Sequence, residues 1–403
     1  MRNLRVLVLT YEYPPIGGGG GRVAREIAQR LSSRGIEFHV LTARWGTLPA
    51  SENHGNVYVY RVSSGRKYPD RCTIPEMFFY LISSTIFVFR NFKRIRPHLV
   101  HVHFAVPSGP TAYLIKKIFR TPYIITLHGG DVPGFLPEET DWAYRIVYPL
   151  TVPIWREAER VIAVSESLRD LAKQAYPKIP VYVIPNGVEI KQNIFHQNIR
   201  REKVRIVFVG RFSRQKNPMM FLKSIKRLID FDYKLTNKIE ILMIGDGDLR
   251  ALMENYIIKN GLGNVIRLLG WIKQEEVEEI LINSDIYVNT SIIEGFSLSV
   301  LQAMAAGMAV IATAVPGNRE LIEHQVNGWL VSPDSVHELS FALYCLINDS
   351  FTRNILGKNA LIKAKYYHWE SVCEKYLRVY IEVLGEGIME NASCQEGLAR
   401  RKY

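Results

Sequence analysis

The sequence has few of the features that mark membrane-spanning or disulfide-bonded proteins. It contains no run of the roughly 18 consecutive apolar residues that a membrane-spanning helix needs. The first segment has only about five apolar residues before Thr10 and two prolines, too few for the core of a signal peptide. Four cysteines stand far apart, with no CxxC pair to indicate a zinc site or a disulfide framework. We therefore expect a cytoplasmic protein.

Acidic residues are scarce in the first third of the chain. Residues 1–130 contain 18 lysines and arginines but only 6 acidic residues, whereas the remaining 273 residues contain 33 of each. A basic surface attracts phosphates or anionic lipid, or merely keeps a protein soluble. No recognisable nucleic-acid-binding module accompanies the charge, so we predict no nucleic-acid partner.

Apolar runs alternate with amphipathic segments along the whole chain, which predicts an α/β fold. "LRVLVLT" and "VRIVFVG" are continuous apolar runs, as in parallel strands that are covered on both faces. A polar stretch separates two such series. We predict two facing, Rossmann-like, doubly wound domains at 1–187 and 203–368, followed by a helix with a polar tail at 369–403. Ligands of such folds bind at the carboxyl ends of the strands, here in an inter-domain cleft.

Two cations follow the first predicted strand of the second domain. Arg211 lies at its carboxyl end, and Lys216 lies just before a helix that begins near Asn217. A guanidinium, an ammonium and a helix N-terminus together form a site for an anion such as phosphate. The alternative is an ordinary solvated basic turn.

The segment "EGFSLSVLQ" adds a carboxylate and a helix start to this anion site. Glu294 can only accept hydrogen bonds, which suits sugar hydroxyls and not phosphate. Gln302 lies two helical turns further on, about 12 Å along the axis. Between them the first-turn amides are donors suited to a pyrophosphate, and these belong to Phe296, Ser297 and Leu298.

These motifs resemble the retaining glycosyltransferases of family 4, which have the GT-B fold. "EGFSLSVLQAMAAGMAVIAT" is similar to their E-x7-E segment, and "VGRFSRQKN", "IPNGV", "GDGDL" and "NGWLV" follow their order. The resemblance implies transfer of a sugar from a nucleotide donor with retention of configuration. It implies that Arg211 and Lys216 neutralise the leaving diphosphate and that Glu294 holds donor-sugar hydroxyls. Gln302 departs from the family, which usually has a glutamate that accepts from the ribose.

The resemblance also assigns roles in the N-terminal domain and to the C-terminal helix. It implies that His128 contacts the transferred sugar, and that the loop containing Gly18 and Gly19 reaches towards the donor phosphate and the acceptor. The C-terminal helix is expected to cross back towards the N-terminal domain. Asp131 is a second candidate for substrate binding, with a helix N-cap as the alternative. No metal and no cofactor are expected, because cations and helix dipoles can supply the positive charge.

Several other interpretations remain open at this level. The five glycines at 17–21 do not form a G-x-G-x-x-G motif, but Arg44 would suit an NADP phosphate in an oxidoreductase. His101 and His103 share one face of a strand and are either metal ligands, buried hydrogen-bonded residues or neighbours of the acceptor. A non-hydrolysing nucleotide-sugar epimerase would share the two-domain architecture, and a catalytically impaired relative would keep only nucleotide-sugar binding.

Residues 75–97 join an apolar run to a cluster of arginines and lysine. Such a segment can lie on an anionic membrane surface and bring a lipid-linked acceptor within reach. The alternative is a sheet-covering helix whose C-terminal cations suit its dipole. The substrates expected from the sequence are thus a nucleotide-sugar donor and a glycan or lipid-linked acceptor, with peripheral membrane association as a further expectation.

Overall fold

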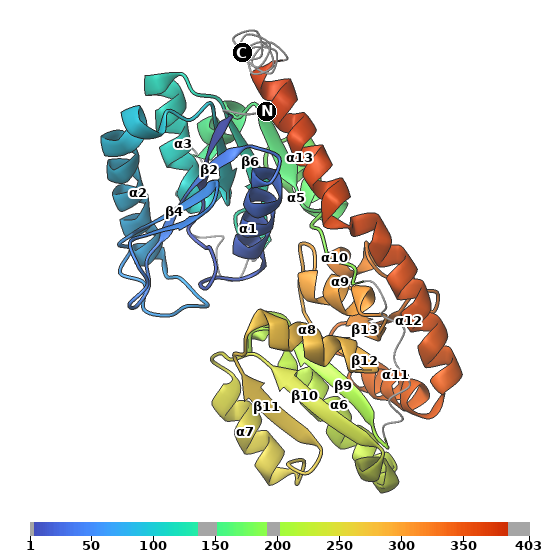
Figure 1. The fold of residues 1–403 in the computed structure, drawn as a ribbon. Coiled ribbons are helices and arrows are strands. Elements are labelled where there is room, and N and C mark those ends of the chain that lie inside the picture. Colours follow the sequence, from blue (N-terminus) through green and yellow to red (C-terminus); the bar gives the residue numbers. More distant parts are fainter. Residues whose placement is uncertain (1–3, 136–150, 192–201, 386–403) are drawn as a thin grey trace, which may run out of the picture. The chain divides into compact units, whose positions relative to one another are not determined.

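The computed structural model describes residues 4–135, 151–191 and 202–385 and divides the chain into two compact units (Figure 1). The first unit comprises Met1–Asn186 together with Trp369–Tyr403, and the second comprises Gly187–His368. The predicted tail beyond residue 385 and most of the predicted linker lie outside the described residues. The expected α/β architecture with a parallel sheet in each domain is confirmed.

The first unit is built on an eight-stranded sheet in the order β3-β4-β2-β1-β5-β6-β7-β8. All neighbouring strands are parallel except β3 and β4. β1 pairs with β2 on one side and with β5 on the other, so the strand order reverses at β1. The carboxyl ends of β1 and β5 therefore flank a topological switch point, where ligands of open α/β sheets bind. The strands are β1 (Arg5–Leu9), β2 (Glu37–Ala43), β3 (Ser51–His54), β4 (Val57–Val62), β5 (Leu99–His103), β6 (Tyr123–Leu127), β7 (Arg160–Ala163) and β8 (Val181–Val183).

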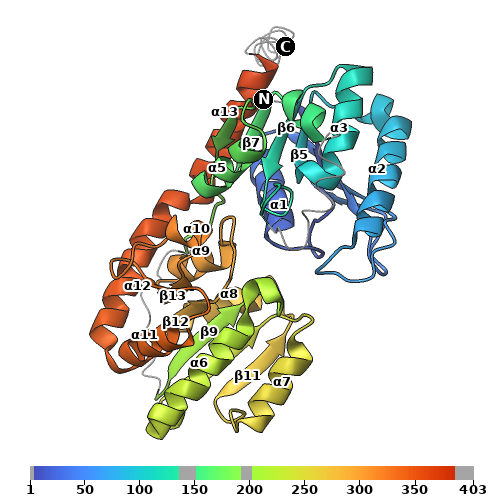
Figure 2. The ribbon, with the colours of Figure 1, turned by 180° about the vertical axis from the view of Figure 1, so that it is seen from behind.

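Helices cover both faces of this sheet. The described ones are α1 (Gly19–Ser32), α2 (Ile74–Ile95), α3 (Ala105–Phe119), α5 (Glu166–Ala175) and α13 (Trp369–Leu384). Helix α1 packs against α13, and α2 packs against α3 on the opposite face (Figures 1 and 2). This division follows from right-handed crossovers that run in opposite directions from β1. Helix α2 begins at a capping box, in which the Thr73 amide donates to Glu76 Oε2 at 2.7 Å.

The C-terminal helix α13 is anchored to the first unit by buried and charged contacts. Tyr380, on its buried face, places its hydroxyl 2.7 Å from Nδ1 of His101. At the other end, the Arg34 guanidinium pairs with Glu370 at 2.8 Å and Glu374 at 2.5 Å. Those two carboxylates raise the pKa of Arg34. The segment 369–385 therefore folds as part of the N-terminal unit although it follows the second unit in sequence.

The second unit contains a six-stranded, fully parallel sheet in the order β11-β10-β9-β12-β13-β14. Its order reverses at β9, so the carboxyl ends of β9 and β12 flank a second switch point. The strands are β9 (Val204–Val209), β10 (Ile239–Ile244), β11 (Ile266–Gly270), β12 (Ile286–Asn289), β13 (Ala309–Thr313) and β14 (Trp329–Val331).

The helices of the second unit bury apolar faces against this sheet. Helix α6 begins after Asn217, whose Oδ1 accepts from the Met220 amide at 3.3 Å, and it buries Phe221, Ile225 and Leu228. The helical elements are η1 (Arg214–Lys216), α6 (Pro218–Phe231), η2 (Tyr233–Asn237), α7 (Arg250–Lys259), α8 (Gln274–Ile282), α9 (Leu298–Ala305), α10 (Pro316–Arg319), α11 (Val336–Asn348), α12 (Ser350–Ala364) and η3 (Lys365–Tyr367).

Candidate active site

Hydrogen bonds hold together the two segments that follow β9 and β12 at the switch point. The Thr290 hydroxyl donates to the carbonyl of Lys216 at 2.9 Å, and the Ile292 amide donates to the carbonyl of Gln215 at 2.9 Å. These contacts join residues more than 70 positions apart in sequence. The loop that carries Glu294 is therefore fixed against the short helix η1 that carries Lys216.

The centre of this arrangement is an ion pair between Lys216 and Glu294. The Lys216 Nζ lies 2.5 Å from Glu294 Oε1, and the Ser291 hydroxyl donates to the same oxygen at 2.7 Å. The Asn289 side-chain amide donates to it at 3.4 Å. The Glu294 side chain is 7% exposed and that of Lys216 is 22% exposed, so water screens the pair weakly. Among the described residues, all of these contacts fall on Oε1, which leaves Oε2 to accept from a ligand.

A second layer of polar side chains orients this carboxylate, and sequence reasoning did not identify it. Asn289 Oδ1 accepts from the Ser291 amide at 3.2 Å and from Asn318 Nδ2 at 3.1 Å. Gly317 follows β13, and a Cβ there would lie 2.5 Å from the Glu294 carbonyl oxygen. Their position in the sequence could have identified these two asparagines, because Asn289 ends β12 and Asn318 follows the end of β13 by five residues.

The remaining predicted residues of this half lie around the same switch point. Arg211 is half-buried and lies two residues after β9 ends, close in sequence to Lys216. Ser297 caps α9 by accepting from the Val300 amide at 3.4 Å. The Phe296 side chain is buried against the ring of Tyr367, so its backbone is what remains for a ligand.

Exposure differs along helix α9. Leu298 begins the helix, and Gln302 lies on it one turn from its end. Both side chains are partly exposed, whereas Val300 and Leu301 between them are buried. Gln302 is therefore on the solvent-accessible side of α9, as contact with a ligand requires.

The glycine-rich loop of the first unit is organised around Glu12, a residue that sequence reasoning missed. The Gly18 amide donates to Glu12 Oε2 at 2.8 Å, and Gly19 is the first residue of α1. Gly17 has a φ of +89°, and a Cβ there would lie 2.4 Å from the Glu12 Cβ. A phosphate at Gly18 would therefore compete with an internal carboxylate for that amide. The fully buried guanidinium of Arg66 lies 3.8 Å from Glu12 and balances its charge.

His128 and Asp131, directly after β6, form one structural group. The Asp131 carboxylate accepts from the backbone amides of His128 at 2.9 Å, Gly129 at 3.0 Å and Ala105 at 2.9 Å. Burial raises the pKa of Asp131, and these backbone hydrogen bonds oppose the rise. Asp131 thus caps the start of α3 from a neighbouring loop and holds the backbone at His128. These contacts occupy the Asp131 carboxylate within the protein.

His128 is a neutral, hydrogen-bonded side chain. Its Nε2 lies 3.0 Å from Nδ1 of His103, at the end of β5. Burial lowers the pKa of His128 to about 3, because a charged imidazolium would lose its hydration there. The side chain can therefore bind a polar ligand, and near neutral pH it is the neutral imidazole with one N–H and not the charged imidazolium.

His101 and His103 are buried residues of the strand β5. His101 Nδ1 bonds to Tyr380 at 2.7 Å and its Nε2 to Thr126 at 2.8 Å. Of the three sequence alternatives, the structure supports buried hydrogen-bonded histidines. Within residues 4–135, 151–191 and 202–385, no group of three or more histidine, cysteine or acidic side chains is arranged to hold a metal ion. None of the described helices combines the length and hydropathy that crossing a bilayer requires.

Two family descriptions match successive parts of the chain. "Glycosyltransferase Family 4" matches residues 17–192, and "Glycosyl transferases group 1" matches residues 189–362. An uncharacterized glycosyltransferase of Methanocaldococcus jannaschii is 30% identical over 382 residues, which cover 94% of this chain and 99% of that protein. A UDP-Gal:alpha-D-GlcNAc-diphosphoundecaprenol alpha-1,3-galactosyltransferase of Escherichia coli is 26% identical over 296 residues, 69% of this chain and 73% of that protein.

Solved structures show the same fold. Sucrose-phosphate synthase from Thermosynechococcus elongatus matches with a TM-score of 0.79 and 19% identity, over 94% of this chain and 99% of that one. Anabaena Alr3699/HepE, in complex with UDP-glucose, matches with a TM-score of 0.74 and 19% identity, over 94% of this chain and all of that one. The two-domain match and the family matches agree. The chain therefore belongs to glycosyltransferase family 4, the group 1 glycosyl transferases, and has the GT-B fold.

Proposed function

We propose that this glycosyltransferase moves a hexosyl unit from a UDP- or GDP-linked sugar to a hydroxyl of a glycan or lipid-linked acceptor. The product would serve surface polysaccharide or glycolipid synthesis. A nucleotide-sugar donor is supported by the UDP-glucose bound to the Anabaena protein, and a lipid-linked acceptor by the name of the Escherichia coli relative. The second unit would bind the donor and the first unit the acceptor. Family membership argues against the epimerase and oxidoreductase alternatives.

The observation that carries this proposal is the buried ion pair of Lys216 with Glu294 Oε1. It leaves Glu294 Oε2 beside an ammonium, which places an acceptor for sugar hydroxyls next to a cation for phosphate. Lys216 and Arg211 would neutralise the leaving diphosphate. A protein that supplies this charge itself does not need a metal ion for it, so we propose metal-independent transfer.

The first turn of α9 and the far end of the same helix would complete the donor site. The backbone at Phe296, Ser297 and Leu298 would face the pyrophosphate, where a helix N-terminus favours negative charge. Gln302 would contact the ribose, since its amide can both accept and donate hydrogen bonds. In the first unit, His128 would contact the transferred sugar.

We further propose that transfer retains the anomeric configuration through attack on the face that the diphosphate leaves. The acceptor oxygen forms a bond to the anomeric carbon as the bond to the diphosphate oxygen breaks, and the acceptor's proton passes to that leaving oxygen. The protein would contribute positioning and charge stabilisation. NMR of the product glycoside, whose anomeric configuration is fixed once the new bond forms, would show whether it matches the configuration of the donor. An inverted product would contradict this mechanism.

A thermal-shift screen with UDP, GDP and ADP tests the donor site. One nucleotide should raise the melting temperature of the wild type, and Arg211→Ala should weaken that stabilisation. Glu294→Ala should abolish transfer yet leave binding of the free nucleotide largely intact, because its partner is the sugar. Nucleotide binding that is unaffected by Arg211→Ala would contradict the phosphate assignment. Nucleotide-sugar binding without transfer would favour an impaired relative, and Gln302→Glu would test whether that position is responsible.

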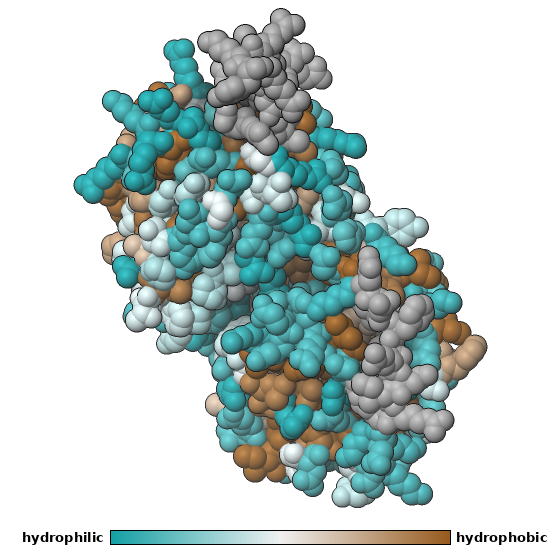
Figure 3. Space-filling view, viewed as in Figure 1, coloured by the Kyte–Doolittle hydropathy of each residue, from teal (hydrophilic) through white to brown (hydrophobic). Residues whose placement is uncertain are grey.

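We also propose that the first unit associates with an anionic membrane surface through α2. Six apolar side chains of this helix are exposed, each by more than a third: Ile74, Phe78, Phe79, Ile82, Ile86 and Phe89. At helical spacing they form one face, opposite the buried Tyr80, Ser84 and Val88. Brown apolar residues accordingly appear at the surface where α2 lies (Figure 3).

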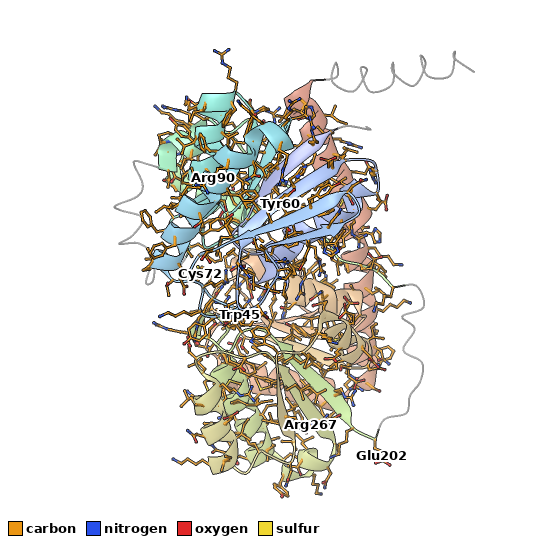
Figure 4. All side chains as sticks on the ribbon, turned by 60° about the vertical axis from the view of Figure 1, so that its left-hand side comes forward. Trp45, Tyr60, Cys72, Arg90, Glu202 and Arg267 are labelled. Atoms are coloured by element: carbon orange, nitrogen blue, oxygen red, sulfur yellow. The ribbon has the colours of Figure 1, made fainter. Side chains whose placement is uncertain are left out.

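The charge beside this face is complementary to anionic lipid. Arg90, Lys93 and Arg94 stand in the last turns of α2 and are exposed, and Figure 4 labels Arg90 on this helix. The one acidic residue of α2, Glu76, is buried in the capping box. An apolar face with a cationic end is the composition of helices that lie in the membrane interface. A peripheral position would bring a lipid-linked acceptor to the enzyme.

Flotation with vesicles of phosphatidylcholine, with and without phosphatidylglycerol, tests this surface. The wild type should float with the anionic vesicles, and high salt should reduce binding. Phe78→Ser with Ile82→Ser should abolish flotation. The matched control is Phe351→Ser with Ile355→Ser on α12, where both side chains are also exposed. No flotation of the wild type would contradict membrane association. A dimer that Phe78→Ser with Ile82→Ser disrupts would instead assign the face to self-association.

A further inference from the structure

His103 is buried between two other histidines at the carboxyl ends of β5 and β6. Its ring lies 4.2 Å from that of His101 and 5.3 Å from that of His128, measured between ring centres. Both nitrogens of His101 are hydrogen-bonded, to Tyr380 and to Thr126. His103 differs, because its Nδ1 lies 3.0 Å from His128 Nε2, while its Nε2 is buried and has no hydrogen-bond partner among the residues that the structure describes.

The contact between His103 and His128 involves two neutral imidazoles. Burial lowers the pKa of His128 to about 3 and that of His103 well below its ordinary value. A neutral imidazole has one N–H and one lone pair, so a single proton lies between the two facing nitrogens. If His128 donated it, His103 would carry its own proton on Nε2, a buried N–H for which the described part of the chain offers no acceptor. If His103 donates it, the unpaired atom is only a lone pair, which proteins tolerate more often than an orphaned donor.

We propose that His103 is a positioning residue that donates from Nδ1–H to His128 Nε2 and thereby fixes His128 as the Nδ1–H tautomer. The ring of His128 is also held from other sides. The centre of the Phe104 ring lies 4.7 Å from that of the His128 ring. Gly20 packs so closely against His128 that a Cβ at this glycine would lie only 3.0 Å from His128 Cγ. The backbone amide of His128 is fixed by Asp131. Nδ1 is the ring nitrogen of His128 that no described residue engages.

This inference rests on the proposed function for its consequence, though not for its geometry. A fixed Nδ1–H makes His128 a hydrogen-bond donor, so its partner on the substrate is an oxygen that accepts, either a sugar hydroxyl oxygen or a phosphate oxygen. A nitrogen that carries its proton in the neutral form cannot act as a base. His103 would therefore influence how tightly the donor substrate binds without contacting it.

Long-range proton–nitrogen NMR spectra of the full chain, labelled with ¹⁵N-histidine, test the tautomer directly. Protonated and unprotonated ring nitrogens resonate apart, and a His128→Gln sample assigns the signals. We expect His128 to carry its proton on Nδ1 near neutral pH and His103 to carry its proton on Nδ1 as well. A His128 signal from the Nε2–H tautomer would overturn the proposal, whether or not the enzyme turns over any sugar.

Two substitutions at His103 separate positioning from packing. His103→Asn keeps an amide N–H near the place of Nδ1 and should preserve the Nδ1–H tautomer of His128. His103→Phe fills the site but removes the donor, and should release the tautomer and raise the KM for the donor sugar about fivefold, the effect of one neutral hydrogen bond. His101→Asn is the control, which should lower the melting temperature while leaving KM and the His128 tautomer unchanged.

The outcomes distinguish this inference from the proposed function. Equal KM values for His103→Phe and the wild type, with folding and donor binding intact, would overturn the positioning role and leave the glycosyltransferase assignment standing. If no nucleotide sugar bound to the wild type, the proposed donor would fail. The NMR tautomer would still decide for or against the hydrogen bond from His103 to His128.

Discussion

Replacing Lys216 by alanine would leave the Glu294 carboxylate buried without its counter-ion. The pair is short, at 2.5 Å, and the Glu294 side chain is 7% exposed. Removal of one partner from a buried ion pair costs about 3–5 kcal/mol. Lys216 is 22% exposed and Ser291 still donates to Glu294, so we expect the lower end, about 3 kcal/mol. For a unit of this size that corresponds to a fall in melting temperature of roughly 6–12 °C, measurable by calorimetry.

A second substitution distinguishes a stranded charge from lost packing. Lys216→Ala combined with Glu294→Gln should recover most of the stability, because the charge is gone while the amide oxygen still accepts from Ser291. The matched control is Lys226→Ala, since Lys226 also lies 2.5 Å from a carboxylate, that of Asp230, but on an exposed helix surface. Its effect should stay under about 1 kcal/mol. A Lys216→Ala variant as stable as the wild type, or a double variant no more stable than the single one, would refute the reasoning.

Three further predictions concern close packing, titration and the docking of α13. Gly317→Ala should displace the backbone at Glu294, because the new Cβ would lie 2.5 Å from the Glu294 carbonyl oxygen. Calorimetric titration should show nucleotide-sugar binding weakened about tenfold or more, which corresponds to at least about 1.4 kcal/mol. Unchanged binding would contradict this close packing. Burial lowers the pKa of His101 and His128 from 6.5 to about 3, so their contribution to stability is complete above about pH 6.5 and is lost as the pH falls towards 3. Urea unfolding measured across this range should show stability decreasing towards acid, and a flat profile would contradict their burial. Tyr380→Phe removes the 2.7 Å hydrogen bond to His101 and should cost about 1–3 kcal/mol in urea unfolding, with no change expected if α13 does not dock on β5.

Sequence periodicity determined the elements of this protein because burial leaves a local record. Strands covered on both faces appear as continuous apolar runs, and β1 and β9 are such runs. The motif from Glu294 to Gln302 likewise indicated a carboxylate followed by a helix start, since both features are local to a few residues. The sequence placed Lys216 and Glu294 in the same site but did not predict that the two side chains form an ion pair.

The tertiary structure alone decided which groups are already occupied. The Gly18 amide donates to Glu12, and the Asp131 carboxylate accepts from three backbone amides. Asn289 also donates to Glu294 Oε1, and His103 keeps one nitrogen that no described residue engages. The contact of Asp131 with the Ala105 amide joins residues 26 positions apart, and the other contacts join residues two to six positions apart in loops that no helix or strand periodicity describes. Sequence therefore specified the types of groups near the site, and tertiary packing, which fixes the shape of these loops, determined which of their atoms remain for a substrate.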